Sequence, residues 1–312
     1  MAKVSILLPV YNGEQFLKGA IESILSQTFT DFEFIIMDDG STDGTSAILD
    51  HYQRLDDRIH IHHHEHQGLI ASLNRGCHIA RGKYLARMDA DDVSVSERLD
   101  RQVEHLETHP EIGVLGCGVQ VIDGDGKKIL TFQFPAEHGV LRFRLCFYNA
   151  LTFAHPAVMM RRELLKRVGG YNPDMVHSED YELWSRLCGL TRLSNLRDVL
   201  FYLRKHESNV TRVPRHIELQ IKNGMTINQR VLSEVLGEEI PIGLIQLLYT
   251  LEFKTLGEVG RVVGLIYRIY KAIVADRTLS TAEKRKIRND ALRQGFLLAG
   301  RTVKSPLRRM LR

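Results

Sequence analysis

The feature that most constrains the fold is the repeated alternation of strand-like and helix-like patterns in the first 90 residues. Residues 3–10 (KVSILLPV) and 32–37 (FEFIIM) are near-continuous apolar runs, as in strands buried on both faces. Between them, residues 14–25 place apolar side chains at helical spacing. Further elements are predicted as a helix over 43–52, a strand over 58–64, a helix over 69–80 and a strand over 84–88. This alternation predicts a Rossmann-like α/β fold with a mostly parallel sheet flanked by helices.

The pattern changes in the second half of the chain. From about Gly113 it becomes strand-rich, and the stretch from Asp123 to Gly126 (DGDG) predicts a hairpin turn. A helix is predicted around residues 180–188, and the chain reads as helical beyond about Arg215. We therefore expect a first domain over residues 1–212 and a helical, basic C-terminal region over residues 213–312.

Charge, cysteine content and hydropathy set the broad class of protein. The stretch from Arg204 to the end carries 21 Lys/Arg and 10 Asp/Glu, a net +11, which leaves −7 for the first 203 residues. The four cysteines show no disulfide or metal-ligand spacing, which predicts free thiols in a reducing compartment. No signal peptide precedes the first strand, and no window of about 18 uncharged apolar residues could form a transmembrane helix. We expect a cytoplasmic protein, located at the inner face of the cytoplasmic membrane if the basic region binds lipid.

Polar clusters follow three of the predicted strands, at Tyr11–Gly13, Asp38–Ser41 and Asp89–Asp92. Ligands of such sheets bind beyond the carboxyl ends of the strands. The three carboxylates of the last cluster repel one another unless a cation is present, and Mg²⁺ or Mn²⁺ would suit them. The alternative is a solvated acidic turn. Asp39 could accept a hydrogen bond from a nucleobase or a ribose, or could simply belong to a turn.

Later motifs allow both chemical and structural interpretations. Glu179 and Asp180 open a predicted helix, where they could cap it or provide the base that deprotonates a hydroxyl. Trp184 could stack on a sugar, although packing is favoured. Single histidines at 155 and 206 are structural by default, and the histidines between 60 and 66 alternate along a strand, which does not favour a metal site. The absence of GxGxxG and of a P-loop argues against a dehydrogenase and a P-loop enzyme.

Taken together, these motifs resemble the family 2 inverting glycosyltransferases, a large bacterial group with the GT-A fold. The resemblance covers roughly residues 1–210. The matching stretches, in order, are VSILLPVYNGEQFLKGAIESILSQTFTDFEFIIMDDGSTDGT, GLIASLNRGCHIARGKYLARMDADD, HPAVMMRRELLKRVGGYNPDMVHSEDYELWSRL and LRKHES. Because the chain lacks the transmembrane helices of processive synthases, it resembles the non-processive members.

The resemblance implies a role for particular residues. On the donor side, the implied nucleotide contacts are Pro9, Val10, Tyr11, Asp39, Asn74, Asp89 and Ala90. Asp91 would be the direct ligand of Mn²⁺ or Mg²⁺, and His206 would complete the metal or diphosphate site. Asp180 would be the catalytic base, with Glu179, Trp184 and His155 on the acceptor side. His66 stands where relatives often carry asparagine.

The implied activity is transfer of a sugar from a nucleotide-diphosphate donor, most commonly a UDP-sugar, to a hydroxyl of a glycan or lipid-linked acceptor in cell-surface polysaccharide biosynthesis. A nucleotidyltransferase that makes an activated sugar, or a non-catalytic scaffold, is the alternative. From Lys284 onward ten basic residues accompany one acid, so this tail could contact a membrane surface or be a solvated helical face. The helical region also has enough apolar surface for a homodimer, and no nucleic-acid motif is present.

Overall fold

The computed structural model describes residues 2–147, 152–206 and 214–301. Their contacts divide the chain into two compact units, one made of residues 1–136 and 151–220 and the other of residues 137–150 and 221–312. The sequence predicted one cut at 212/213, which lies outside the described residues. In the contact-based division, residues 137–150 belong with the C-terminal helices, which a single boundary along the sequence does not describe.

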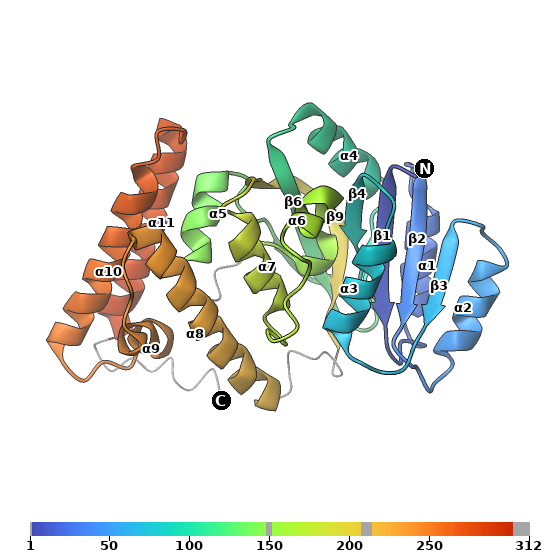
Figure 1. Cartoon of the computed structure of the whole chain (residues 1–312), viewed down its shortest axis with the longest axis horizontal. Helices are drawn as coiled ribbons and strands as arrows, with labels where there is room; N and C mark the ends of the chain where they lie inside the picture. The colour runs from blue at the N-terminus through green and yellow to red at the C-terminus, as the bar shows by residue number, and fades with distance from the viewer. Residues whose placement is uncertain (1, 148–151, 207–213, 302–312) are drawn as a thin grey trace. The chain divides into compact units, whose positions relative to one another are not determined.

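The first unit is built around a mixed sheet of nine strands within the described residues (Figure 1). The strands are β1 Val4–Val10, β2 Phe32–Asp38, β3 Ile59–His63, β4 Tyr84–Arg87, β5 Val93–Ser94, β6 Ile112–Ile122, β7 Lys128–Phe132, β8 Met159–Arg161 and β9 Arg192–Arg204. Their order is β3-β2-β1-β4-β8-β6-β9-β5, and β7 pairs with β6. The first four strands in this order are parallel, as expected from their apolar sequences, whereas β8 pairs antiparallel with both β4 and β6.

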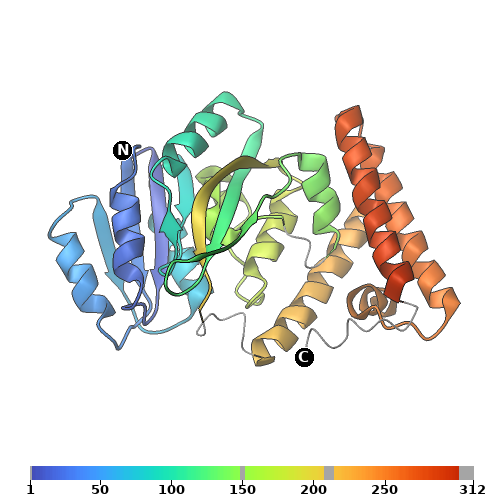
Figure 2. The same ribbon diagram turned by 180° about the vertical axis from the view of Figure 1, so that it is seen from behind.

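Helices cover both faces of this sheet. They are α1 Leu17–Leu25, α2 Thr45–Gln53, α3 Leu69–Ile79, α4 Arg98–Thr108, α6 Arg162–Arg167 and α7 Glu179–Leu187, with a short 3-10 helix, η1, at His155–Ala157. The apolar faces of α1 and α4 pack with alternate residues of β1 in one core, on the face shown in Figure 2. On the other face α3 lies so close to β1 that a Cβ at Gly76 would be 2.1 Å from Leu7. Any side chain at position 76 would therefore require the buried Leu7 side chain to move.

The predicted hairpin turn is present between β6 and β7. The backbone N–H of Asp123 donates to the Lys127 carbonyl (2.9 Å), and the Asp123 carboxylate accepts the backbone N–H groups of Asp125 and Lys127. This side chain closes the turn because an aspartate oxygen can bond main-chain groups two and four residues along.

The second unit is helical, as the sequence predicted beyond about residue 215. It contains α5 His138–Leu145, most of α8 Pro214–Leu236, α9 Ile242–Thr250, α10 Leu256–Val274 and α11 Thr281–Arg301. Thr255 and Glu258 form a capping box that starts α10, and Ser280 with Glu283 makes the same reciprocal contacts before α11. Arg144 of α5 pairs with Asp290 of α11 at 2.8 Å, which ties residues 137–150 to this unit. In the part of the chain that the structure describes, no helix has the length and apolar character needed to cross a membrane.

Candidate active site

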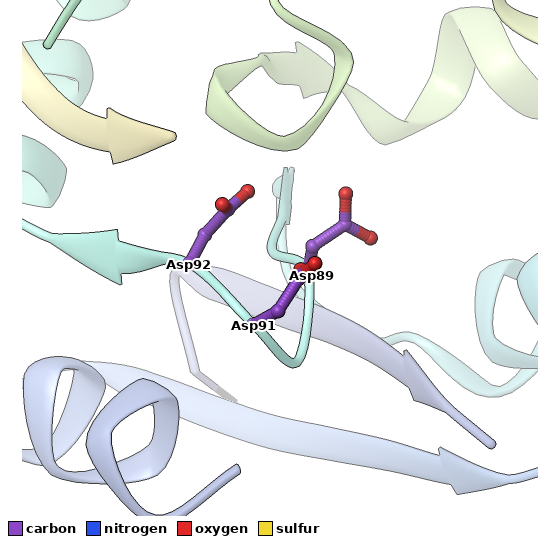
Figure 3. A group of neighbouring side chains, drawn as sticks. All are labelled: Asp89, Asp91 and Asp92. Carbon is purple, nitrogen blue, oxygen red and sulfur yellow. The ribbon is translucent and has the colours of Figure 1, made fainter. Parts of the chain in front are cut away.

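The acidic cluster lies in the turn between β4 and β5, where Asp89, Asp91 and Asp92 project from one short stretch of chain (Figure 3). One ligand oxygen from each carboxylate lies within 4.8 Å of the others. Asp92 is only 1% exposed, and its Oδ2 has no hydrogen-bond partner among the described residues. Burial and then the Asp89 and Asp91 charges raise the pKa of Asp92 well above its ordinary value. A divalent cation would relieve both the repulsion and the unpaired oxygen, so these residues fit one.

Arg87, the last residue of β4, supplies a buried positive charge beside this cluster. Its guanidinium forms an ion pair with Asp89. Burial raises the pKa of Asp89, and Arg87 opposes that rise only in part. The sequence predicted no role for Arg87. The available signal was a charged residue closing an otherwise apolar strand (YLAR), where burial is costly without a partner.

The structure brings the late histidine to the acidic cluster. His206 Nε2 lies 2.9 Å from Asp91 Oδ2, although the two residues are 115 positions apart in the chain. The His206 ring also packs on Phe16, with 4.9 Å between ring centroids. Imidazole nitrogen and carboxylate oxygen are both ligands for Mn²⁺. The two residues that the resemblance assigns to the metal are therefore adjacent.

On the donor side, Pro9 and Val10 end β1 and are buried, whereas Tyr11 just beyond them is 48% exposed. The Tyr11 ring stacks on His66 with 4.1 Å between centroids. Ala90 is half-buried in the acidic turn. Of the three residues predicted to line a base pocket, Tyr11 alone therefore presents an accessible ring.

Asp39 is buried, and four protein groups surround its carboxylate. Its oxygens accept the backbone N–H groups of Gln67 and Gly68, both at 2.8 Å. His66 and His64 lie 2.9 and 3.3 Å from the same carboxylate. The Nδ1 atoms of His66 and His64 also bond main-chain carbonyls, those of Asp39 and Glu65 respectively. His66 is the more exposed of the two histidines, with 55% of its side chain accessible.

The histidine tract thus has a role that the alternation argument missed. His63 Nδ1 lies 2.8 Å from Asp38 Oδ2, and Ser41 and Ser46 also donate to that carboxylate. Burial would raise the pKa of Asp38, but these hydrogen bonds outweigh it and lower the pKa. The tract surrounds the donor-side aspartates instead of forming a site of its own. The parallel pairing of β2 with β3 brings these segments together, and the sequence showed only the individual strands.

Asn74, for which a nucleotide contact was predicted, also bonds a neighbouring loop of the protein. Its amide donates to the Tyr171 carbonyl and accepts the Tyr171 backbone N–H, both at 2.8 Å. These bonds fasten α3 to the loop after α6. These bonds use one of the two N–H donors and one of the two oxygen acceptor positions of the amide, so the nucleotide contact of Asn74 stays a prediction.

Glu179 and Asp180 begin α7, as the sequence predicted. Glu179 is buried, whereas Asp180 is half-buried and bonds the Tyr181 backbone N–H at 2.7 Å. Burial and then the Asp180 charge raise the pKa of Glu179 to about 7. Burial also raises the pKa of Asp180, against the Tyr181 hydrogen bond and the Arg87 charge. A partly accessible carboxylate with a raised pKa is suited to accept a proton near neutral pH.

Aromatic side chains pack behind this pair of carboxylates. Trp184 is 2% exposed and lies against Phe153 and His155, at centroid distances of 5.4 and 5.9 Å. His155 Nε2 is 2.9 Å from the Tyr171 hydroxyl, and burial followed by the Arg87 charge lowers the pKa of His155 well below its ordinary value. The buried Trp184 ring therefore packs inside the protein, the interpretation that the sequence favoured.

The mixed sheet, the acidic turn with its facing histidine and the carboxylates at the start of α7 fit a glycosyltransferase, and the comparisons show that class. The sequence profile of glycosyl transferase family 2 matches residues 5–169, and the chain belongs to this family. EpsE of Bacillus subtilis is 35% identical over 234 residues, which is 73% of this chain and 81% of EpsE. The O-antigen biosynthesis glycosyltransferase WbnJ of Escherichia coli is 32% identical over 66% of this chain and 81% of WbnJ. The glycosyltransferase MJ1057 of Methanocaldococcus jannaschii is 35% identical, but the match spans only 59% of this chain and 63% of MJ1057.

Solved structures show the same fold. S. aureus TarS (residues 1–349), in complex with UDP-GlcNAc, aligns with a TM-score of 0.61 over 95% of this chain and 89% of TarS, at 18% identity. A mannosyltransferase from Pyrobaculum calidifontis, in complex with GDP-Man and Mn²⁺, aligns with a TM-score of 0.54 over 96% of this chain and 86% of its own, at 16% identity. The GT-A architecture expected from the sequence is confirmed.

Proposed function

We propose that this glycosyltransferase moves a sugar, with inversion, from a nucleotide-diphosphate donor to a hydroxyl of a glycan or lipid-linked acceptor in cell-surface polysaccharide biosynthesis. The observation that carries the proposal is the buried, unpaired carboxylate oxygen of Asp92 in an acidic turn that also faces His206. UDP is the first candidate nucleotide, since TarS, which has the same fold, is solved with UDP-GlcNAc. The biosynthetic role of WbnJ supports the polysaccharide assignment.

Each residue of the site has a part in this proposal. Asp89, Asp91, Asp92 and His206 would hold Mn²⁺ or Mg²⁺, which when bound offsets the negative charge of the departing nucleoside diphosphate. Tyr11 offers a ring for the nucleobase. Asp180 takes the proton of the acceptor hydroxyl as the oxygen attacks the anomeric carbon. The positive charge of Arg87 stabilises the ionised carboxylates of both Asp89 and Asp180. The Asn74 contact to Tyr171 keeps the acceptor-side loop in place.

The direct test is calorimetric titration of the purified protein with UDP, GDP and dTDP, each with and without Mn²⁺. We expect one nucleotide to bind clearly more tightly when Mn²⁺ is present, because the cation bridges carboxylates and phosphate oxygens. Ca²⁺ and Zn²⁺ serve as controls for ion specificity. Equal binding with and without Mn²⁺ would contradict the metal assignment, and binding of none of the three would contradict the donor assignment.

We further propose that the helical region contacts an anionic membrane surface, consistent with a lipid-linked acceptor. Three apolar side chains on the exposed side of α10 are Leu256 (85% exposed), Val263 and Tyr267. Two basic side chains, Arg261 and Lys271, are also exposed on this helix. Apolar and aromatic side chains flanked by Lys and Arg match a lipid interface, and each basic residue adds about 1 kcal/mol of attraction. The sequence had placed this contact in the basic tail, of which residues 302–312 lie outside the described residues.

Vesicle flotation tests the membrane contact. We expect the full chain to bind vesicles that contain phosphatidylglycerol, to bind phosphatidylcholine vesicles weakly, and to be released by salt. The double change Val263→Glu and Tyr267→Glu should abolish binding. The matched control is Leu55→Glu, an exposed apolar residue of the first unit. Binding that survives the double change would place the contact elsewhere, and a concentration-dependent dimer that the double change disrupts would assign the face to a second copy.

A further inference from the structure

Arg204, the last residue of β9, contacts three segments that are far apart in the sequence. Its Nε donates to the Asp91 carbonyl at 2.8 Å, and its Nη1 donates to the carbonyls of Asp123 and Gly124 at 3.2 and 3.0 Å. The guanidinium also lies 4.7 Å from the centroid of the Phe16 ring. These hydrogen bonds go to backbone carbonyls, and no carboxylate among the described residues forms an ion pair with Arg204.

The main chain of Arg204 adds a second attachment to the acidic turn. Its backbone N–H donates to Asp92 Oδ1 at 2.7 Å. Asp91 is thus held through its carbonyl and Asp92 through its carboxylate. Two residues further along, His206 faces the Asp91 carboxylate, and Phe16 packs against both Arg204 and His206. The end of β9 therefore bonds two of the three aspartates of the acidic turn and brings His206 to that turn.

These hydrogen bonds matter because the carboxylates of the acidic turn repel one another. Three carboxylates within 4.8 Å repel one another, so the turn tends to open unless something holds the backbone. The planar guanidinium can bond the turn and the β6–β7 hairpin at once, which the single ammonium of a lysine cannot do in the same geometry. Groups that orient metal ligands in this way commonly change metal affinity by about 10–100-fold when they are lost.

We propose that Arg204 is a positioning residue that holds the Asp89–Asp92 turn in its cation-binding shape and couples that turn to the β6–β7 hairpin. This inference rests on the proposed function, because it assumes that the turn binds a divalent cation. It adds a residue outside the set that the resemblance implied. It also gives the Asp123–Gly126 hairpin, which the sequence singled out only as a turn, a part in the site.

The test compares Mn²⁺ affinity, measured by electron paramagnetic resonance of free Mn²⁺ at saturating UDP, in the wild type and three variants of the full chain. We expect Arg204→Gln to weaken Mn²⁺ binding by about tenfold or more and Arg204→Lys to weaken it less. The matched control is Arg101→Gln, which removes an exposed ion pair to Asp198 on the same strand and should leave Mn²⁺ affinity unchanged. Circular dichroism confirms folding, and Arg204→Lys provides the comparison if the glutamine variant is unfolded.

The outcomes separate this inference from the proposed function. Wild-type affinity for Mn²⁺ in a folded Arg204 variant that only melts earlier would show a purely structural role and overturn the inference alone. Failure of the wild type to bind Mn²⁺ with any of the three nucleotides would overturn both. Weakened Mn²⁺ affinity with unchanged metal-free nucleotide binding is the result that supports positioning.

Discussion

We expect Asp180→Asn to lower kcat by about 10²–10⁴-fold, while donor binding in the presence of Mn²⁺ should stay within about twofold of the wild type. The amide keeps the size of the side chain and can still accept the Tyr181 backbone N–H, but it cannot take a proton from the acceptor. Single-turnover kinetics with the preferred donor, together with nucleotide calorimetry, measure the two quantities separately. Normal turnover by this variant would exclude Asp180 as the base.

The pH dependence adds a second readout for the same carboxylate. The base acts when deprotonated, so kcat/KM of the wild type should rise with pH as Asp180, whose pKa is raised by burial, loses its proton. A second inflection is expected near pH 7, because the pKa of Glu179 is about 7 and its ionised form favours proton uptake by Asp180. Glu179→Gln should remove that second inflection. Asp174→Asn, an exposed carboxylate of the preceding loop, is the matched control and should leave the profile unchanged.

Much of the fold could be predicted from periodicity alone, because the elements near the N-terminus are buried strands and one-sided helices. The predicted strand over 58–64 is observed as Ile59–His63 and the predicted helix over 69–80 as Leu69–Ile79. The antiparallel insertion of β8 between β4 and β6 could not be predicted. This strand has only three residues, and its position depends on pairings with partners in β4 and β6 that lie 73–77 and 44–46 positions earlier in the chain, which leave no local pattern.

The residues of the candidate site also differ in how far the sequence could predict them. Carboxylates at the ends of strands are visible in the sequence because a parallel sheet brings those ends to one edge. The roles of Arg204 and His63 could not be read from the sequence. Arg204 bonds the backbone carbonyl of Asp91, and His63 bonds Asp38 at the end of another strand, and no sequence motif indicates such contacts. The bond of the Asn74 amide to Tyr171, 97 residues along the chain, was likewise not visible in the sequence. The sequence therefore predicted the charged side chains of the site, but not the side chains that hold them in position.

Asp91→Asn should change metal binding and stability in opposite directions. Loss of this charged ligand oxygen should weaken Mn²⁺ binding by about 100-fold or more. Mn²⁺ should then no longer increase the affinity for the nucleotide. Without metal, the same change should stabilise the fold, since it removes one of the charges that raise the pKa of Asp92 and Asp89. Relief of about 1 kcal/mol corresponds to a rise in Tm of about 2–4 °C. Calorimetry and thermal unfolding in a chelating buffer measure the two effects.

The sign of the pH effect makes the second half of this prediction specific. A carboxyl group whose pKa is raised on folding stabilises the fold when it is protonated, and this contribution is lost as the pH rises through the folded pKa. The stabilisation by Asp91→Asn should therefore be larger at pH 8 than at pH 5, where Asp92 is more protonated. Asp125→Asn, at the exposed hairpin tip, should change neither Tm nor Mn²⁺ binding. A variant of Asp91 that lost stability at both pH values would show that this carboxylate holds the turn together through His206, and would contradict a cluster under electrostatic repulsion.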